Sequence, residues 1–178
     1  REPAQAERLG VLVAIAPSQR PAADVLARHL SAVVGAGEGI PVTLYVAEQQ
    51  DGGVPLNRGA LMNAAFLAAE AGGADYVVLQ DVDAFPAVGA AYRYASGKRF
   101  AHLVSAPERF GGRVPYARWC GGAMAVHTDL YRAAGGVSTA YWGADMAGSE
   151  DDFCLRVLRA APRGGGGPRA RPDRQPRA

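Results

Sequence analysis

DYVVLQDVDAFP, residues 75–86, is the stretch that decides the fold. Its apolar run, 75–80, predicts a strand that is covered on both faces. Asp81 and Asp83 follow the run directly, separated by one valine, and Pro86 closes the segment. Two interpretations are open at this point: a polar turn at the end of a strand, or a pair of carboxylates that holds a metal ion.

The rest of the chain alternates between strand and helix patterns. Apolar runs predict further strands, and apolar residues at helical spacing between glycine or proline boundaries predict helices. The predicted strands are 11–16, 42–48, 101–106 and 122–127; the predicted helices are 21–34, 58–71, a short one capped by Thr128, and one from Ser149 to Pro162. This order predicts an α/β fold with a mainly parallel central sheet flanked by helices.

Composition and charge predict one globular domain followed by a tail. The chain has 178 residues, of which 49% are hydrophobic, and this suits a single domain over residues 1–161. Residues 162–178, PRGGGGPRARPDRQPRA, have no apolar periodicity and are predicted to be disordered. The seven arginines and one aspartate of residues 156–178 account for the positive net charge, so the body is mildly acidic and no nucleic-acid partner is expected.

Two other composition features give simple expectations. The longest apolar stretch, residues 9–16, is far short of the ~20 residues that a membrane helix needs, so no anchor is expected within this chain. Cys120 and Cys154 are the two cysteines, too few for a disulfide framework, and they are predicted to be free buried thiols.

The two aspartates lie where α/β sheets bind ligands, beyond the carboxyl end of a strand. If the chain stays extended there, Asp81 and Asp83 face the same side and reach one site. Mg²⁺ and Mn²⁺ prefer carboxylate ligands and often bind through one or two of them plus substrate phosphates. The position therefore favours metal and phosphate binding over a solvated turn.

SEDDF, residues 149–153, is a second acidic cluster with two interpretations. Ser149 fits a helix N-cap, and Glu150, Asp151 and Asp152 in the first turn match the positive end of a helix. Three consecutive acids exceed what capping requires, and one of them could instead accept the proton of a substrate hydroxyl.

VPYARWCGG, residues 114–122, places aromatic and basic side chains before a glycine pair. Tyr116 and Trp119 suit a sugar ring or a base, and Arg118 suits phosphate; an aromatic corner of the core is the alternative. His29 lies on an apolar helix face and is expected in the core, whereas the spacing of His102 and His127 is not that of metal ligands.

Taken in order, these segments resemble the beta-1,4-galactosyltransferase family (glycosyltransferase family 7). LNRGALMNAAF (56–66) is similar to the family's F-N-R-A-x-L-x-N-x-G-F, and QDVDAFP (80–86) to its D-V-D-x-x-P. VPYARWCGG resembles P-Y-x-x-Y-x-G-G, and YWG (141–143) followed by EDDF (150–153) resembles W-G-W-G-x-E-D-D. SAPE (105–108) and EDDF lean toward the branch that galactosylates xylose on proteoglycans.

The resemblance implies a GT-A fold, Mn²⁺ as cofactor and UDP-galactose as donor. The implied reaction is inverting transfer to the 4-hydroxyl of a xylose or N-acetylglucosamine type acceptor on a glycoprotein or proteoglycan, in the Golgi lumen, with a membrane anchor outside this chain. It implies Asp83 as the metal ligand and Asp151 as the catalytic base. The residues that it implies for substrate binding are Arg58, Asp81, Tyr116, Arg118, Trp119, Gly122, Trp142, Glu150 and Asp152.

Several positions depart from the family pattern. Leu56 replaces a phenylalanine, Trp119 replaces a tyrosine, Arg20 in PSQRP is what remains of P-F-R-x-R, and the second tryptophan of W-G-W-G is absent. The family's later metal-binding histidine has no counterpart, because all three histidines lie upstream of Glu150, so the domain is expected to be incomplete at its C-terminal end. A catalytically impaired nucleotide-sugar-binding relic and a GT-A transferase with another UDP-sugar donor remain the alternatives.

Overall fold

The computed structural model describes residues 7–93, 100–143 and 147–161, and the predicted tail at 162–178 lies outside them. None of the helices in these ranges is long and apolar enough to cross a membrane. The elements, in chain order, are β1 Leu9–Ile15, α1 Arg20–Leu30, β2 Val42–Glu48, α2 Arg58–Ala71, β3 Tyr76–Gln80, β4 Phe100–His102, β5 Ala123–His127, α3 Thr128–Ala133 and α4 Ala147–Ala160.

The five strands form one sheet in the order β2-β1-β3-β5-β4. β1 pairs in parallel with both β2 and β3, so that Leu9 lies opposite Val42 on one side and Tyr76 on the other. β5 runs antiparallel to both β3 and β4. Four strands therefore share one direction and β5 runs against them, which agrees with the predicted α/β architecture.

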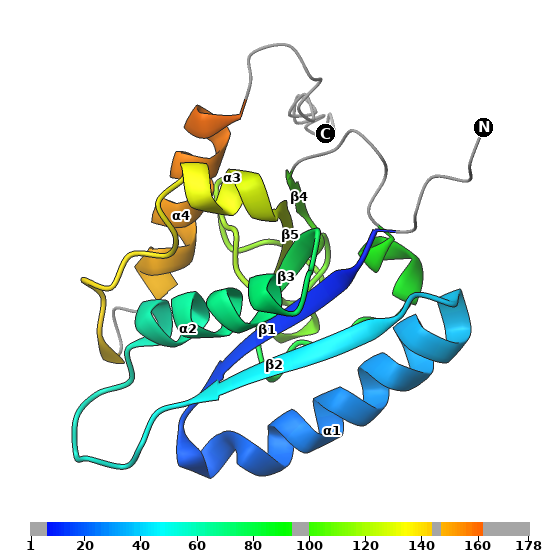
Figure 1. Ribbon diagram of the computed structural model, residues 1–178, viewed down its shortest axis with the longest axis horizontal. Coiled ribbons are helices and arrows are strands. Elements are labelled where there is room, and N and C mark those ends of the chain that lie inside the picture. The colour runs from blue at the N-terminus through cyan, green and yellow to red at the C-terminus, as the bar shows by residue number, and fades with distance from the viewer. Residues whose placement is uncertain (1–6, 94–99, 144–146, 162–178) are drawn as a thin grey trace, which may run out of the picture.

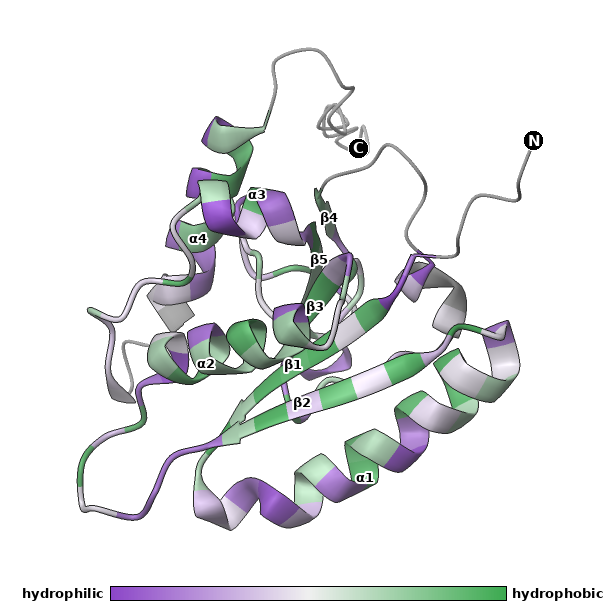
Figure 2. Cartoon of the chain, viewed as in Figure 1, coloured by the Kyte–Doolittle hydropathy of each residue, from purple (hydrophilic) through white to green (hydrophobic). Residues whose placement is uncertain are grey.

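Helices cover both faces of the sheet. In Figure 1, α1 lies on one side of the sheet, while α2, α3 and α4 lie on the other. Figure 2 shows that β1 and β3 are mainly hydrophobic, whereas α1 alternates between polar and apolar residues, as a helix with one solvent-facing side must. Two buried clusters follow, one beneath α1 around Leu26 and one beneath the other helices around Phe66 and Phe153.

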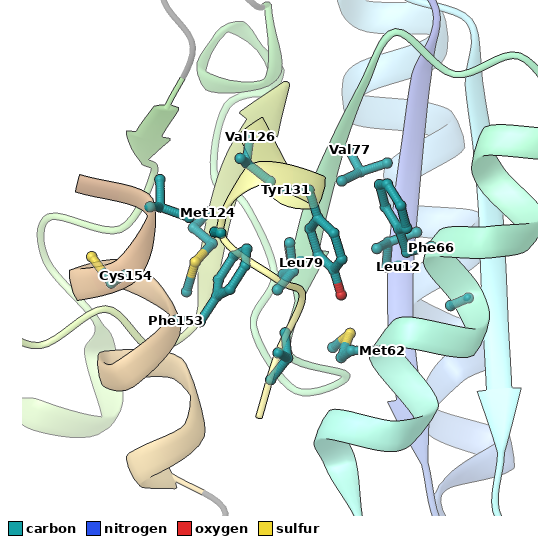
Figure 3. Packing of buried hydrophobic residues seen from close by; sticks show 14 of the residues in the cluster. Leu12, Met62, Phe66, Val77, Leu79, Met124, Val126, Tyr131, Phe153 and Cys154 are labelled. Atoms are coloured by element: carbon teal, nitrogen blue, oxygen red, sulfur yellow. The ribbon is translucent and has the colours of Figure 1, made fainter. Parts of the chain in front are cut away.

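The larger core cluster is built around aromatic side chains from three helices. Tyr131 of α3 stacks on Phe66 of α2 with ring centroids 3.9 Å apart, and its centroid lies 5.0 Å from that of Phe153 of α4. Figure 3 shows these rings packed over Leu79 and Met124 of the sheet. The Tyr131 hydroxyl is satisfied, because it donates to Asn63 Oδ1 at 2.7 Å. This cluster fixes α4 against the sheet.

Three local predictions differ from the structure. The helix predicted over 21–34 leaves α-geometry after Leu30 and continues as a π-helical turn, Ser31–Ala36, where Gly35 and the following Gly37 lower helix propensity. The strand predicted over 101–106 pairs only as far as His102. Thr128 does not cap α3, because its hydroxyl donates to the Asp75 carbonyl; the His127 ring accepts from the backbone instead.

The prediction of free thiols is wrong. Cys120 and Cys154 form a disulfide, with Cα atoms 6.5 Å apart and a sequence separation of 34. Cys120 precedes β5 and Cys154 lies in α4, and both face the core cluster beneath that helix. The packing of α4 against the loop before β5 brings the two sulfurs together. The number of cysteines in a sequence does not predict which of them the fold brings into contact.

We expect Phe153→Ala to lower the free energy of unfolding by ~3–5 kcal/mol, because it empties a fully buried site. Urea denaturation followed by circular dichroism measures this loss. Leu158→Ala on the same helix is the matched control: its side chain is 53% exposed, so its loss should stay within ~0.5 kcal/mol. Equal losses for the two variants would mean that α4 presents a different face to the core.

Candidate functional site

Asp81 is fixed at the carboxyl end of β3 by the residue that precedes β5. The Asp81 N–H donates to the Gly122 carbonyl at 2.7 Å, and the Gly122 N–H donates to Asp81 Oδ2 at 3.1 Å. Gly122 has φ +88°, and a Cβ there would lie 2.8 Å from a methyl carbon of Val104. A glycine is therefore required where the chain enters β5.

Arg58 joins Asp81 to the second acidic cluster. Asn57 caps α2 by accepting from the Ala60 N–H at 2.9 Å, so Arg58 is the first residue of the helix and points to the end of β3. Its Nη2 lies 2.7 Å from Asp81 Oδ1 and 2.5 Å from Glu150 Oε1. Burial lowers the pKa of Arg58, but the two carboxylates raise it more, so the group is a cation between two acids.

Glu150 differs electrostatically from a surface glutamate. Burial and, to a smaller extent, the nearby Asp81 carboxylate raise the pKa of Glu150 to about 7, against the opposing effect of Arg58. This side chain is therefore more easily protonated than a surface glutamate. The acid form of a glutamate donates a hydrogen bond, whereas the carboxylate form accepts one.

Asp83 lies in a turn, so the expectation of an extended chain is wrong. The Ala84 N–H donates to the Asp81 carbonyl at 3.1 Å. The Gln80 side chain stabilises this turn, because its Nε2 donates to the Ala84 carbonyl while its Oε1 accepts from the Tyr92 hydroxyl. The expectation that both carboxylates reach one site nevertheless holds, because both face Arg109.

Arg109 is the site residue that the sequence did not reveal. Its Nη2 lies 3.4 Å from Asp81 Oδ2, and its Nη1 lies 3.4 Å from Asp83 Oδ2. The Asp83 side chain is 66% exposed and that of Arg109 is 46% exposed, so solvent and ligands reach this pair. The one available signal was a basic residue two positions before the glycine pair at 111–112, and such a pattern is common on protein surfaces.

A cavity of about 590 Å³ opens beside the two aspartates. Its lining includes Asp83, Phe85, Pro107, Arg109, Trp119 and Gly122. The lining thus combines charged groups with aromatic and apolar groups, a combination typical of sites that orient a small polar ligand.

The Trp119 ring forms part of this wall. Its centroid lies 5.4 Å from that of His102 and 5.7 Å from that of Phe110, in edge-to-face contacts. A Cβ on Gly121 would lie 2.7 Å from Trp119 Nε1, so the ring lies directly over that glycine. Trp119 is therefore a lining residue of the cavity.

The acids of residues 150–152 point in three directions. Because α4 begins at Ala147, Ser149 lies inside the helix, and the N-cap interpretation of this serine is wrong. Glu150 contacts Arg58, whereas Asp152 accepts from Arg156 Nε at 3.0 Å, one turn along the helix. Asp152 is therefore turned away from the cluster around Asp81.

Asp151 faces the loop that precedes β5. Its Oδ1 accepts from the Cys120 N–H at 3.0 Å, and its Oδ2 accepts from the Tyr116 hydroxyl. This hydrogen bond raises the pKa of Tyr116 to about 12, so the phenol stays protonated and acts as a donor. The two oxygens of Asp151 are thus oriented by two donors of one loop.

The remaining predicted residues lie at the margin. Trp142 is 49% exposed. The N–H of the adjacent Gly143 donates to the carbonyl of Leu56, two residues before Arg58, at 2.9 Å. Arg118 is exposed. Arg20 is ion-paired with Glu48 near the carboxyl ends of β1 and β2. The structure thus brings together Arg58, Asp81, Asp83, Trp119, Gly122 and Glu150, with Tyr116 and Asp151 beside them.

Within the described residues, no group of three or more His, Cys, Asp and Glu side chains is placed to enclose a metal ion. The histidines are engaged elsewhere: His29 Nε2 lies 2.8 Å from the Pro86 carbonyl, His102 Nε2 lies 2.9 Å from the Gly121 carbonyl, and His127 caps α3. Asp81 and Asp83 still fit an ion of the Mg²⁺ or Mn²⁺ type that is completed by phosphate oxygens.

No family model matches the chain. Among curated proteins, it is 32% identical to mouse Beta-1,4-galactosyltransferase 2 over 116 residues, covering 64% of this chain and 30% of that protein. It is 28% identical to the Caenorhabditis elegans Xylosylprotein 4-beta-galactosyltransferase over 103 residues, covering 57% of this chain and 34% of the relative. The chain thus spans about a third of the length of these relatives.

Solved structures agree with the sequence comparison. A Drosophila beta-1,4-galactosyltransferase 7 mutant in complex with manganese, UDP-Gal and xylobiose superposes with a TM-score of 0.73 and 25% identity, covering 86% of this chain and 62% of that one. The mannosyltransferase PcManGT from Pyrobaculum calidifontis, with GDP-Man and Mn²⁺, gives a TM-score of 0.58 at 14% identity over 86% of this chain and 52% of its own, a likeness of fold alone. The chain is therefore a homologue of the β-1,4-galactosyltransferases and has their GT-A fold.

Proposed function

We propose that this protein is an inverting, Mn²⁺-dependent galactosyltransferase that moves galactose from UDP-galactose to the 4-hydroxyl of an acceptor sugar. The observation that carries the proposal is the cluster of Arg58, Asp81 and Glu150 at the carboxyl edge of the sheet. The exposed Asp83 lies beside it and lines the cavity. The relatives of this chain are named as galactosyltransferases. The acceptor is a xylose or N-acetylglucosamine type sugar on a glycoprotein or proteoglycan. The names of the C. elegans relative and of the Drosophila complex with xylobiose support the xylose class.

The donor would bind along the aspartate edge of the cavity. Asp83 is the carboxylate with room for a metal ligand bond, because Asp81 already contacts Arg58 and Gly122. A divalent ion held by Asp83 would screen the diphosphate and stabilise the charge of the departing UDP. Arg109 lies beside both carboxylates and provides a guanidinium for phosphate oxygens.

The acceptor would bind between α4 and the loop before β5. Asp151 would take the proton of the acceptor 4-hydroxyl as that oxygen attacks the anomeric carbon from the face opposite UDP. Glu150 lies next to it and would hold acceptor hydroxyls, with Tyr116, Trp119 and Trp142 along the sugar rings. Arg118, Gly122 and Asp152 remain proposed binding residues, although Asp152 contacts Arg156 in this state.

We further propose residence in the Golgi lumen, with a membrane anchor outside this chain. The disulfide between Cys120 and Cys154 supports an oxidising compartment, because such bonds are rare in reducing ones.

A transferase with another UDP-sugar donor is the second candidate. Trp119 supports it, because this large ring lines the cavity where the family pattern has a tyrosine and so changes the space for the sugar. Donor competition separates the two candidates: a preference for UDP-glucose or UDP-GalNAc over UDP-galactose would replace galactose in the proposal.

We expect Asp83→Ala to weaken UDP binding in the presence of Mn²⁺ by roughly 100-fold. Loss of a residue that only supports a metal ligand already lowers the affinity for the metal by about 10–100-fold. Titration calorimetry with UDP, with and without Mn²⁺, measures the effect, and chelation of the metal should reproduce it in the unmodified protein. Asp129→Ala is the control, because this carboxylate is 72% exposed and follows the opposite end of β5. Unchanged UDP affinity in the Asp83 variant would exclude Asp83 as a metal ligand.

We expect Asp151→Asn to lower kcat for galactose transfer by ~10²–10⁴-fold while UDP binding stays unchanged, because the amide cannot accept the acceptor proton. Transfer from UDP-galactose to xylosides and N-acetylglucosaminides measures kcat, and Asp129→Asn is again the control. If the unmodified protein binds UDP with Mn²⁺ but transfers no sugar, the nucleotide-sugar-binding relic becomes the better description.

A further inference from the structure

We propose that the Cys120–Cys154 disulfide is a positioning device for Asp151, an inference that rests on the function proposed above. The bond joins the loop before β5 to α4. Cys154 lies three residues after Asp151 on this helix, so the two side chains share a face. The covalent link therefore lies one helical turn from the carboxylate that would act as base.

The same loop supplies both hydrogen bonds to that carboxylate. The Cys120 N–H donates to Oδ1 at 3.0 Å and the Tyr116 hydroxyl donates to Oδ2. The disulfide partner Cys120 is thus also one of the two donors. The disulfide and the two hydrogen bonds together link the loop before β5 to one face of α4.

The hydrogen bonds alone would hold this loop weakly. Residues 111–118 are exposed, and the Tyr116 side chain is 49% exposed, so water competes for the same donors and acceptors. A typical hydrogen bond contributes ~1 kcal/mol net, which is little against the freedom of an exposed loop. With the covalent link intact, the Cys120 N–H stays next to α4 and the carboxylate stays in one orientation.

The cysteines act through Asp151 and take no part in the chemistry. Both side chains are buried, 6% exposed for Cys120 and 5% for Cys154, so the bond does not touch the cavity directly. When it is cut, a phosphine reductant supplies two electrons, water supplies two protons and the phosphine takes the water oxygen, leaving two thiols. Displacement of a catalytic group by ~1 Å can cost ~10²-fold in rate, so loss of this link is expected to lower kcat.

The experiment compares the oxidised protein, the phosphine-reduced protein and a Cys120→Ala/Cys154→Ala double variant. The chain has two cysteines, so the reductant acts on one bond. We expect kcat for galactose transfer to fall by ~10–100-fold in the reduced protein and in the double variant. Mn²⁺-dependent UDP affinity should change less than twofold, and the double variant should not respond to reductant.

Breaking the disulfide in the Asp151→Asn variant separates a positioning role from general support of the fold. If the bond acts through Asp151, breaking it in the Asp151→Asn background should lower kcat no further, because interacting changes are not additive. A general structural role would lower kcat in both backgrounds and weaken UDP binding in parallel, and that result would overturn the proposal. Two free thiols in the untreated, denatured protein, or equal kcat before and after reduction, would also overturn it.

Hydrogen exchange keeps the test independent of transfer activity. Amides of residues 114–122 should exchange faster after reduction, while those of β1 and α2 stay unchanged. If no form of the protein transfers galactose, the proposed function fails, and exchange then decides alone. Faster exchange confined to residues 114–122 supports the anchoring role, and unchanged exchange there contradicts it.

Discussion

The structure of the site depends on one buried cation between two acids. Arg58 begins α2, Asp81 ends β3 and Glu150 lies in the first turn of α4, so one guanidinium holds three elements together. Taking a charge out of water costs several kcal/mol, and this cost is offset only while the partners stay in place. The meeting point of α2, β3 and α4 is therefore fixed electrostatically, and the cavity forms beside it.

Two arginines flank Asp81, and they play different parts. Arg58 contacts Asp81 from the buried side, whereas Arg109 contacts Asp81 and Asp83 from the exposed side at 3.4 Å. Asp81 is thereby tied into the framework, while Asp83 has one long, solvent-exposed contact. The exposed pair is therefore the part of this cluster that solvent reaches.

The sequence predicted the features that depend on local chemistry. Apolar runs located the five strands, helical spacing located α2, and the position of Asp81 and Asp83 after a buried strand indicated the site. Features set by contacts between distant residues were missed. The pairing of Cys120 with Cys154, the contact of Arg109 with both aspartates and the start of α4 before Ser149 all depend on how the elements pack.

The family resemblance supplied what local chemistry could not. Arg58 and Glu150 are 92 residues apart, and neither composition nor spacing relates them. The motifs placed both at one site, and the geometry agrees. Asp152, which the same motif includes, contacts a neighbouring arginine on its own helix and not this cluster.

The reversed direction of β5 has a consequence for how the site can vary. In an all-parallel sheet, only the segments that leave the strands reach the ligand edge. Because β5 starts at that edge, with Ala123 opposite Gln80, the segment that enters it also borders the cavity. The approach to β5 therefore carries Tyr116, Trp119 and Cys120, and its length and composition can change during evolution while the order and register of the strands stay the same.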